Sequence, residues 1–198
     1  MLTESLQIIS FKNLIDMGCG TGQLLIELAH LKPDAHFIGI DSDEQKLNEA
    51  QHRVQEARIA SRVTLLAKDC VQTSLPAHSA DVAVFRNVLH HVKDLSAVFH
   101  EVNRILCPGS FFFIQDGTRM PEVQFEEMNE ELRPLGVPLD IHPGFDTVTL
   151  TKQLSEHGFN IEQVTIVGKA TFATSPYTTK EYVTDAFLLS ATKSEDLS

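Results

Sequence analysis

The sequence predicts an α/β protein built on a doubly wound, mostly parallel sheet of seven strands, with the last strand antiparallel. Short apolar runs alternate along the chain with segments whose apolar residues recur at helical spacing. Such alternation favours right-handed crossovers and a parallel sheet, which binds ligands at the carboxyl ends of its strands. The chain has 198 residues, 42% of them hydrophobic, which suits a single domain over 1–198 with a sizeable core.

The first half of the chain predicts two strand and helix pairs. Residues 13–17, NLIDM, form a short buried strand in this prediction, and residues 36–41, HFIGID, form the second strand. The helix between them collects leucines on one face: Leu24, Leu25, Leu28 and Leu31. A second helix is expected to begin near Asp43. Its apolar residues are Leu47, Ala50, Val54 and Ala57.

The middle of the chain predicts three more strands, at 62–69, 80–85 and 111–116. Residues 70–79, CVQTSLPAHS, are too short and too rich in helix breakers for a crossover helix, so we expect a loop with at most one helical turn. The clearest helical stripe in the chain comes before the fifth strand: Leu95, Val98, Phe99, Val102, Ile105 and Leu106. The segment CPGS should end that helix, because Pro108 cannot continue it and Gly109 can adopt a left-handed turn.

The last third of the chain predicts a helix, a stop at Gly158 and a sixth strand within 149–168, followed by a seventh strand at 181–193. Residues 169–179 are expected to form a long irregular link, which suits an antiparallel return strand. Between the fifth strand and this helix lies the segment 117–145. Its acidic residues predict a solvated helix face: Glu122, Glu126, Glu127, Glu130 and Glu131.

Composition excludes several classes of function. The formal net charge is −11, and no run of Lys or Arg offers a basic patch, so nucleic acid is not an expected partner. Three unclustered cysteines favour a reducing, cytoplasmic location. The N-terminus lacks the pattern of an export signal, and no apolar run approaches the ~20 residues of a membrane span. The nine histidines show no metal-ligand spacing, so no metal is expected.

A glycine-rich stretch, DMGCGTG at 16–22, directly follows the first strand. Its spacing is G-x-G-x-G, whereas the dinucleotide-binding fingerprint would need a glycine at Gln23, and no Lys follows as in a P-loop. An acidic side chain at Asp16 would repel a diphosphate, so a ligand with positive charge fits better. Further aspartates lie at the ends of other predicted strands, namely Asp41, Asp69 and Asp116, where helix capping is their alternative role.

The stretch DMGCGTG resembles the first motif of class I S-adenosylmethionine-dependent methyltransferases, and the similarity extends from Asn13 to Asp116 before it weakens. AKDC resembles the family's adenine-contacting stretch. DVAVFRNVLHHVKD and VFHEVNRILCPGSFFFIQD are similar to the fourth and fifth strands of the small-molecule branch, which includes the ubiquinone/menaquinone C-methyltransferases. The resemblance implies a Rossmann-like methyltransferase fold. It also implies in-line methyl transfer from S-adenosyl-L-methionine to a small-molecule acceptor, with S-adenosyl-L-homocysteine as product.

The resemblance also implies which residues bind the cofactor. The glycines would let the main chain approach its amino-acid end, where amide N–H groups meet the carboxylate and Asp16 meets the ammonium. Asp41 would accept both ribose hydroxyls, Asp69 the adenine amine, and the N–H of Cys70 would meet a ring nitrogen. The full set of cofactor-binding candidates is Asp16, Gly18, Cys19, Gly20, Gly22, Asp41, Ser42, Asp69, Cys70, Arg86 and Asn87.

The catalytic candidates are His90, His91 and His142, as proton acceptors. Methyl transfer can also proceed by positioning and desolvation alone, or with Asp116 as base. We expect the acceptor between 86–92 and 117–145, so that 117–145 is a substrate-side insertion. Only Met1–Lys12 precede the first strand, where relatives often carry a helical lid, so a second subunit of a homodimer could cover the cofactor.

Two other functions fit part of this pattern. A non-catalytic S-adenosylmethionine-binding protein or regulatory subunit would keep the cofactor residues without chemistry. A nucleotide-dependent oxidoreductase is disfavoured by the glycine spacing.

Overall fold

The computed structural model describes residues 2–135, 143–173, 178 and 181–195. Its helices and strands follow one another along the chain in the alternating order that the sequence predicts. They are α1 (Leu2–Ile8), β1 (Asn13–Met17), α2 (Gln23–Leu31), β2 (His36–Asp41), α3 (Glu44–Glu56), η1 (Ala60–Arg62), β3 (Val63–Ala67), β4 (Ala80–Arg86), η2 (Leu89–His91), α4 (Leu95–Ile105), β5 (Leu106–Gly117), α5 (Glu122–Leu132), η3 (Arg133–Leu135), α6 (Thr147–Glu156), β6 (Phe159–Ala173) and β7 (Tyr182–Lys193).

The strands form one seven-stranded sheet in the order β3-β2-β1-β4-β5-β7-β6. The pairs among β1 to β5 are parallel, whereas β7 is antiparallel to both β5 and β6. The predicted fold class, with its antiparallel last strand, is therefore confirmed. The chain order reverses between β1 and β4, and this switch point opens a crevice at the carboxyl ends of these two strands.

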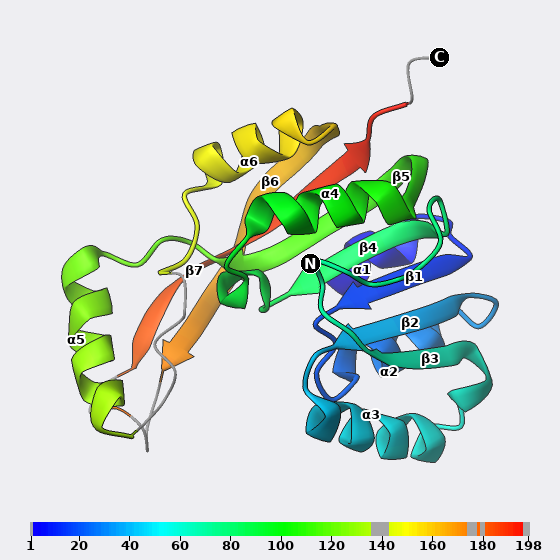
Figure 1. The fold of residues 1–198 in the computed structure, drawn as a ribbon, viewed down its shortest axis with the longest axis horizontal. Helices are drawn as coiled ribbons and strands as arrows, with labels where there is room; N and C mark the ends of the chain where they lie inside the picture. The colour runs from blue at the N-terminus through cyan, green and yellow to red at the C-terminus, as the bar shows by residue number, and fades with distance from the viewer. Residues whose placement is uncertain (1, 136–142, 174–177, 179–180, 196–198) are drawn as a thin grey trace.

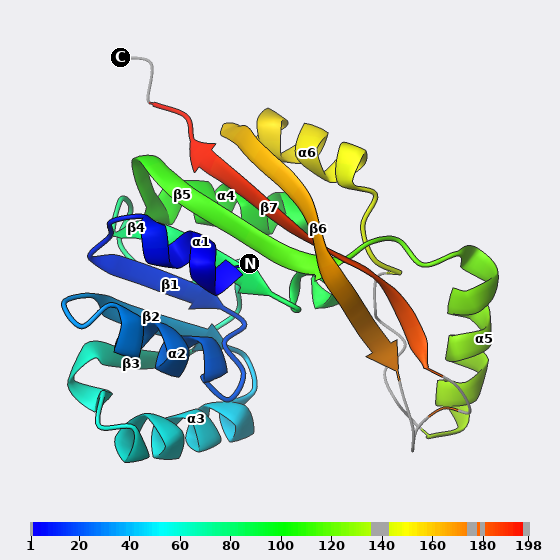
Figure 2. The same ribbon diagram turned by 180° about the vertical axis from the view of Figure 1, so that it is seen from behind.

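Helices cover both faces of the sheet (Figures 1 and 2). Helices α4 and α6 pack on one face, where Phe99, Phe112 and Leu154 belong to a single buried cluster. Helices α1, α2 and α3 contribute to the cluster on the other face, which includes Leu6 and Leu25. Buried on both faces, the central strands carry consecutive apolar residues, as expected for parallel strands.

Aspartates begin three of the helices. The side chain of Asp43 accepts hydrogen bonds from the N–H groups of Gln45 and Lys46 at the start of α3. Asp94 accepts from Ala97 in α4, and Asp146 accepts from Thr149 in α6. These caps satisfy amide groups that have no partner inside a helix.

Three expectations from the sequence are wrong in detail, and one helix was missed. Leu31 is 41% exposed and does not join the buried leucines of α2. Helix α4 ends at Ile105, before the segment CPGS, because Leu106 pairs with Ala80 in the extended conformation of β5. Residues 169–173 belong to β6 and are not irregular, because β7 pairs with them along their length. The short helix α1 was not predicted, because its two buried residues, Leu2 and Leu6, are too few to give a recognisable helical periodicity.

The segment 117–145 leaves the sheet and returns to it. Its ends lie side by side, because the N–H of Phe145 donates to the carbonyl of Gly117 and the N–H of Arg119 donates to that of Phe145. Between them, α5 lies beside the ends of β6 and β7, away from the centre of the sheet (Figures 1 and 2). It buries its apolar side in a small separate cluster of Met120, Met128, Leu132 and Tyr182. The acidic residues of α5 are mostly exposed, as predicted, although Glu131 is half-buried and accepts a hydrogen bond from the hydroxyl of Tyr182.

None of the helices among the described residues is both long and apolar enough to cross a membrane.

Candidate functional site

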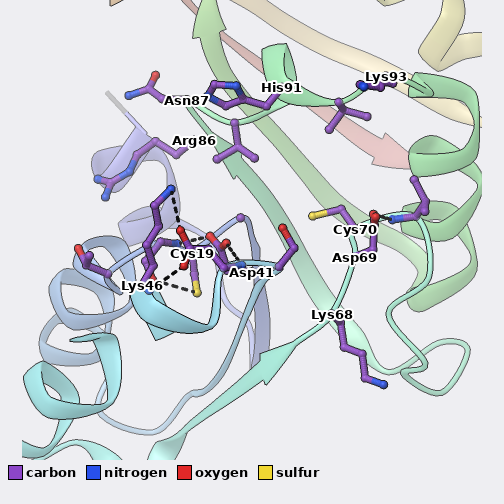
Figure 3. Close-up of a pocket in the computed structure, with 18 of the residues that line it drawn as sticks. Cys19, Asp41, Lys46, Lys68, Asp69, Cys70, Arg86, Asn87, His91 and Lys93 are labelled. Carbon is purple, nitrogen blue, oxygen red and sulfur yellow. Dashed lines mark hydrogen bonds and ion pairs between the residues drawn. The ribbon is translucent and has the colours of Figure 1, made fainter. Parts of the chain in front are cut away.

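A cavity of about 1140 Å³ opens at the carboxyl ends of the strands, at the switch point between β1 and β4 (Figure 3). Most of the residues predicted from the sequence line it: Gly18, Cys19, Gly20, Asp41, Ser42, Asp69, Cys70, Arg86, Asn87 and His91. Asp16, Gly22 and His90 are not among its lining residues. His142 lies outside the described residues. The structure therefore gathers residues from five separate segments around one space.

Val88 and Val92 also line this cavity and belong to the predicted segment 86–92. The sequence did not single out the other lining residues: Thr21, Gln23, Asp43, Lys46, Lys68, Val71, Lys93, Asp94 and Gln115. Lys46, Lys68 and Lys93 bring positive charge to a cavity that also holds several carboxylates. Nothing in the sequence pattern distinguishes these lysines from ordinary exposed ones, because only the crossing of the loops places them together.

The turn between β1 and α2 depends on its glycines. Gly18, Gly20 and Gly22 have φ angles of 78°, 52° and 76°, a region that other residues adopt only with strain. A Cβ atom on Gly18 would lie 2.3 Å from the side chain of Val88, whereas one on Gly20 would meet nothing within 4 Å. Gly18 thus allows close packing against the loop after β4, and Gly20 leaves bare backbone at the cavity.

The amides of this turn are engaged within the protein. The N–H groups of Gly18 and Cys19 donate to the carbonyl of Ile40 at 2.7 and 2.8 Å, and that of Gly22 donates to the carbonyl of Cys19. The N–H of Gly20 donates to Asp41 Oδ2 at 2.8 Å. We expected amides of this turn to bind a ligand carboxylate. Instead, four of them fix the shape of the turn and tie it to β2.

Gly39 of β2 lies beneath this turn and was missed by the sequence reasoning. A Cβ atom there would lie within 2.8 Å of the side chains of Leu25, Cys19 and Leu65. A glycine inside a strand pattern is the signal that could have found it, because such a glycine often marks a close approach of another segment.

Asp41 is held at the end of β2 by backbone groups. Its Oδ2 accepts from Gly20 N and its Oδ1 accepts from Asp43 N at 2.9 Å. The cap of α3 is Asp43, so the alternative role of Asp41 as the cap of this helix is excluded. A carboxylate offers about four lone-pair sites, so each oxygen of Asp41 keeps one for a ligand in the cavity.

Asp16 is buried near the carboxyl end of β1, between Gly39 of β2 and Val84 of β4, with only 3% of its surface exposed. Burial raises the pKa of its carboxyl group to about 7, while the Arg86 guanidinium opposes this rise and the Asp41 carboxylate adds to it. Arg86 in turn forms an ion pair with Glu27 at 3.5 Å. A carboxyl group balanced near neutral pH in this position is a candidate for a functional group.

The loop after β3 carries Asp69 and Cys70 and is anchored to α4. Asp69 Oδ1 accepts from Val71 N at 2.9 Å, which shapes the turn. Further along the loop, the amide and hydroxyl of Thr73 both donate to Glu101 of α4. Hydrogen bonds from Arg104 and Thr73 lower the pKa of Glu101 to about 2, so this anchor is charged at neutral pH.

The thiols of the two cysteines in the cavity, Cys19 and Cys70, are unreactive. Burial is the main cause that raises the pKa of the Cys70 thiol to about 12, and it raises the pKa of the Cys19 thiol as well. Neighbouring carboxylates add to both shifts. Neutral thiols are poor nucleophiles, so these residues line the cavity without a covalent role.

His90 lies in η2 and contacts the end of β5. Its Nδ1 lies 2.7 Å from Asp116 Oδ1, and its backbone N–H donates to Asp116 Oδ2 at 3.3 Å. Asp116 is only 1% exposed, and its Oδ1 also accepts from Gly117 N. The other candidate, His91, lines the large cavity, and burial is the main cause that lowers its pKa.

A second cavity of about 270 Å³ lies beside the first. Its lining residues are Asn87, His90, Gln115, Asp116, Lys169, Ala170, Thr171 and Ala186. Asn87 and Gln115 line both cavities, and the N–H of Asn87 donates to the carbonyl of Gln115. The wall opposite His90 therefore comes from β6 and β7, and no described residue of 117–145 contributes to either cavity.

Within the part of the chain that the structure describes, His, Cys, Asp and Glu form no group of three that could hold a metal ion. The arrangement offers instead a large cavity with anchored carboxylates and a smaller cavity with a histidine and aspartate pair. Such an arrangement can bind a polar ligand in the first cavity and present part of it to a second molecule in the next.

The chain matches the model of a family described as a methyltransferase domain over residues 10–164. A sterol 24-C-methyltransferase of Debaryomyces hansenii is 22% identical over 165 residues, covering 81% of this chain and 43% of that protein. The 27-O-demethylrifamycin SV methyltransferase of Amycolatopsis mediterranei is 30% identical over 124 residues, covering 62% of this chain and 45% of that protein. The chain thus spans less than half of the length of these curated relatives.

Solved structures share the whole fold. A putative methyltransferase of Bacillus halodurans superposes with a TM-score of 0.78 at 16% identity, covering 98% of this chain and 97% of that one. The cyclase SpnF gives a TM-score of 0.74 at 17% identity, covering 98% of this chain and 81% of that one. At this identity the likeness shows the fold, and a fold can carry more than one chemistry.

Proposed function

Because the chain belongs to the methyltransferase domain family, within the class I S-adenosylmethionine-dependent methyltransferases, we propose that it transfers a methyl group from S-adenosyl-L-methionine to a small-molecule acceptor. The observation that carries the proposal is the pairing of Asp41 with Gly20. Backbone N–H groups orient both carboxylate oxygens of Asp41, which lies beside the bare backbone of Gly20. The cavity that these two residues line is large enough for a nucleoside with an amino-acid tail.

The residues around the large cavity fit the parts of this cofactor. Asp41 would accept hydrogen bonds from the two ribose hydroxyls through its remaining lone pairs. Asp69 and the N–H of Cys70 would meet the adenine at the end of β3. Asp16 would attract the ammonium, directly or through a water, once its carboxyl group is ionised.

The cofactor carboxylate needs a partner other than the turn amides that are engaged within the protein. Arg86 lines the cavity and carries a permanent positive charge, of which Glu27 at 3.5 Å neutralises only a part. We propose that Arg86 takes this role and that the glycines provide space and shape.

When bound, the cofactor supplies a methyl group on a positively charged sulfur. The protein contributes orientation, because an in-line displacement requires the acceptor atom behind the methyl carbon. Asn87 and Gln115 line both cavities and can position the two molecules relative to each other. Asn87 has a φ of 56°, a conformation that asparagine tolerates better than most residues and that occurs often at functional sites.

For the domain assignment, the location and the assembly, we propose what the sequence predicts. We propose one methyltransferase domain over 1–198, with 117–145 as an insertion on the acceptor side whose described residues stand outside both cavities. A cytoplasmic location and a homodimer belong to the same proposal.

A non-catalytic S-adenosylmethionine-binding protein is the second candidate, because this fold, which the cyclase SpnF shares, can carry more than one function. Binding and turnover separate the possibilities. Calorimetry should show that S-adenosylhomocysteine binds while NAD(H) and NADP(H) do not. Binding without transfer of a labelled methyl group to any small acceptor would support the non-catalytic role, and binding of NAD(H) would overturn the proposal.

The decisive variant is Asp41→Ala, which should weaken S-adenosylhomocysteine binding by about 1–3 kcal/mol, the scale of a lost charged hydrogen-bond partner. Asp81→Ala is the matched control. Asp81 also accepts two backbone N–H groups, from Lys12 and Asn13, but it lines neither cavity. Equal binding losses in the two variants would mean that Asp41 matters only for stability.

A further inference from the structure

We propose that the second cavity is the acceptor site for a small, polar hydroxyl compound, and that His90, oriented by Asp116, removes the hydroxyl proton during methyl transfer. The inference rests on the proposed function and adds to it the class of acceptor and the identity of the base. Its support comes from the His90 and Asp116 geometry, from the residues that line the cavity and from its connection to the larger one.

The hydrogen bonds of Asp116 define the tautomer of His90. The backbone N–H groups of Gly117 and His90 can only donate, and they contact Oδ1 and Oδ2 respectively. Asp116 therefore acts as an acceptor at both oxygens, and His90 Nδ1, at 2.7 Å from Oδ1, carries the proton of that hydrogen bond. The basic nitrogen of the ring is then Nε2. A buried carboxylate on Nδ1 also stabilises the imidazolium that forms when Nε2 takes a proton.

The second cavity is small and polar. Its volume of about 270 Å³ lies just below the usual range for small-molecule sites. Its walls carry an amide from Asn87, another from Gln115 and the hydroxyl of Thr171, while the apolar contribution comes from two alanines. A sterol skeleton would leave these polar groups without hydrogen-bond partners, which costs free energy. The cavity therefore suits a compact acceptor with its own hydroxyl groups.

The charges at the cavity favour an uncharged acceptor. Lys169 lines the cavity, but its Nζ pairs with Asp185 Oδ1 at 2.5 Å, and the lysine side chain is 69% exposed. The carboxylate of Asp116 also lines the cavity, but it is already paired with His90. An acceptor anion would find no dedicated cation among the described residues of this cavity, whereas a phenol or enol could donate its proton to His90.

The chemical step is balanced by groups already named. The hydroxyl proton passes to His90 Nε2, and an oxygen electron pair forms the new bond to the methyl carbon. The bond from that carbon to sulfur breaks with its electron pair on the sulfur, which becomes neutral. The imidazolium returns its proton to water after the product leaves. No further reactant is required.

The first test is independent of activity. Nitrogen-15 NMR of the ring should show His90 with a protonated Nδ1 and an unprotonated Nε2 in the protein bound to S-adenosylhomocysteine. In Asp116→Asn this preference should be lost, because an amide has one accepting oxygen while donors face both positions of Asp116. A protonated Nε2 in the unmodified protein would overturn the proposal.

The second test follows binding to the cavity. A panel of small phenols should shift the amide signals of Ala170 and Thr171 in the S-adenosylhomocysteine complex, and a sterol should not. Ala170→Phe should remove the phenol shifts elsewhere in the cavity while S-adenosylhomocysteine still binds. If no phenol shifts these signals, or if the sterol does, the proposed acceptor class is wrong.

The third test measures transfer of a labelled methyl group to the phenols that bind. His90→Gln, assayed at saturating cofactor, should lower kcat/KM for the phenol by about 10²-fold or more, as expected for a lost base. His52→Gln is the control, because His52 is an exposed residue of α3 outside both cavities. Unchanged turnover in His90→Gln would refute the base. If the unmodified protein does not bind S-adenosylhomocysteine, the proposed function itself is wrong.

Discussion

At the scale of single residues, Asp16 carries a conflict between stability and binding. Its carboxyl group lies inside the sheet, where burial disfavours the charged form, and the pKa rises to about 7. In the proposed role of Asp16, attraction of the cofactor ammonium requires that same charged form. The ionised group should thus destabilise the empty protein above neutral pH and, if the proposed role is right, favour the binding of a cation.

The variant Asp16→Asn tests this conflict. The folded pKa lies above the unfolded value of about 3.9, so the stability from the neutral form is present below pH 4 and is lost as the pH rises through 7. At pH 8 the variant should therefore be more stable than the unmodified protein by about 1–3 kcal/mol in urea unfolding, with little or no gain at pH 5.

The same variant should bind S-adenosylhomocysteine more weakly at pH 8, by about 1–3 kcal/mol, because it lacks the anion. In the unmodified protein the affinity should rise between pH 6 and pH 8 as Asp16 ionises. A variant that is less stable at pH 8 would indicate that attraction to Arg86 outweighs the cost of burial.

At the scale of elements, glycines in the turn between β1 and α2 serve two different purposes. All of its glycines have positive φ, but Gly18 would clash with Val88 if it carried a Cβ, whereas Gly20 faces open space. Substitution at Gly18 should therefore affect packing and binding together. Substitution at Gly20 should place new atoms where the ligand approaches and should spare the packing.

We expect Gly20→Val to lose S-adenosylhomocysteine binding, because its branched side chain projects into the cavity, while circular dichroism shows a folded protein. Gly109→Val is the matched control: Gly109 also has a positive φ, of 74°, and open space around its Cβ position, but it lies at the start of β5 outside both cavities. Both variants should lose a similar amount of stability, about 1–2 kcal/mol from the strained backbone. Normal binding by Gly20→Val would mean that the ligand does not approach this turn.

The sequence predicts elements well where periodicity is long and buried on one face. It identifies β1 to β5 and the helices between them, and it places the glycine turn at the cavity. It misses α1, which is short, and the extension of β6 to Ala173, because strand pairing with β7 overrides the local preference for an irregular link. It also assigns the turn amides to a ligand, although acceptors from β2, distant in sequence, engage several of them.

At the scale of the whole molecule, the topology explains why one rim collects the functional groups. The carboxyl ends of the parallel strands meet on one side of the sheet, and the order reverses between β1 and β4. The sequence predicts this rim because each strand ends in polar residues. The second cavity could not be predicted, because its far wall comes from β6 and β7, whose placement beside β5 depends on antiparallel pairing over a long sequence distance.

The hydrophobic clusters divide the molecule into parts of unequal stability. Two large clusters cover the faces of the sheet, while α5 depends on a small cluster of its own. Few buried contacts hold α5 in place, so it should open locally at a lower free energy than global unfolding. Hydrogen exchange should therefore be faster in α5 than in β1 and β4.

Two methionines that are both fully buried test this division. Met128→Ala removes a side chain from the α5 cluster, so it should speed hydrogen exchange in α5 and lower the free energy of global unfolding by less than about 1 kcal/mol, since local opening precedes unfolding. Met17→Ala removes the same atoms from β1 in a large cluster and should cost about 2–5 kcal/mol in urea unfolding. Equal global losses would mean that α5 and the sheet unfold as one cooperative unit.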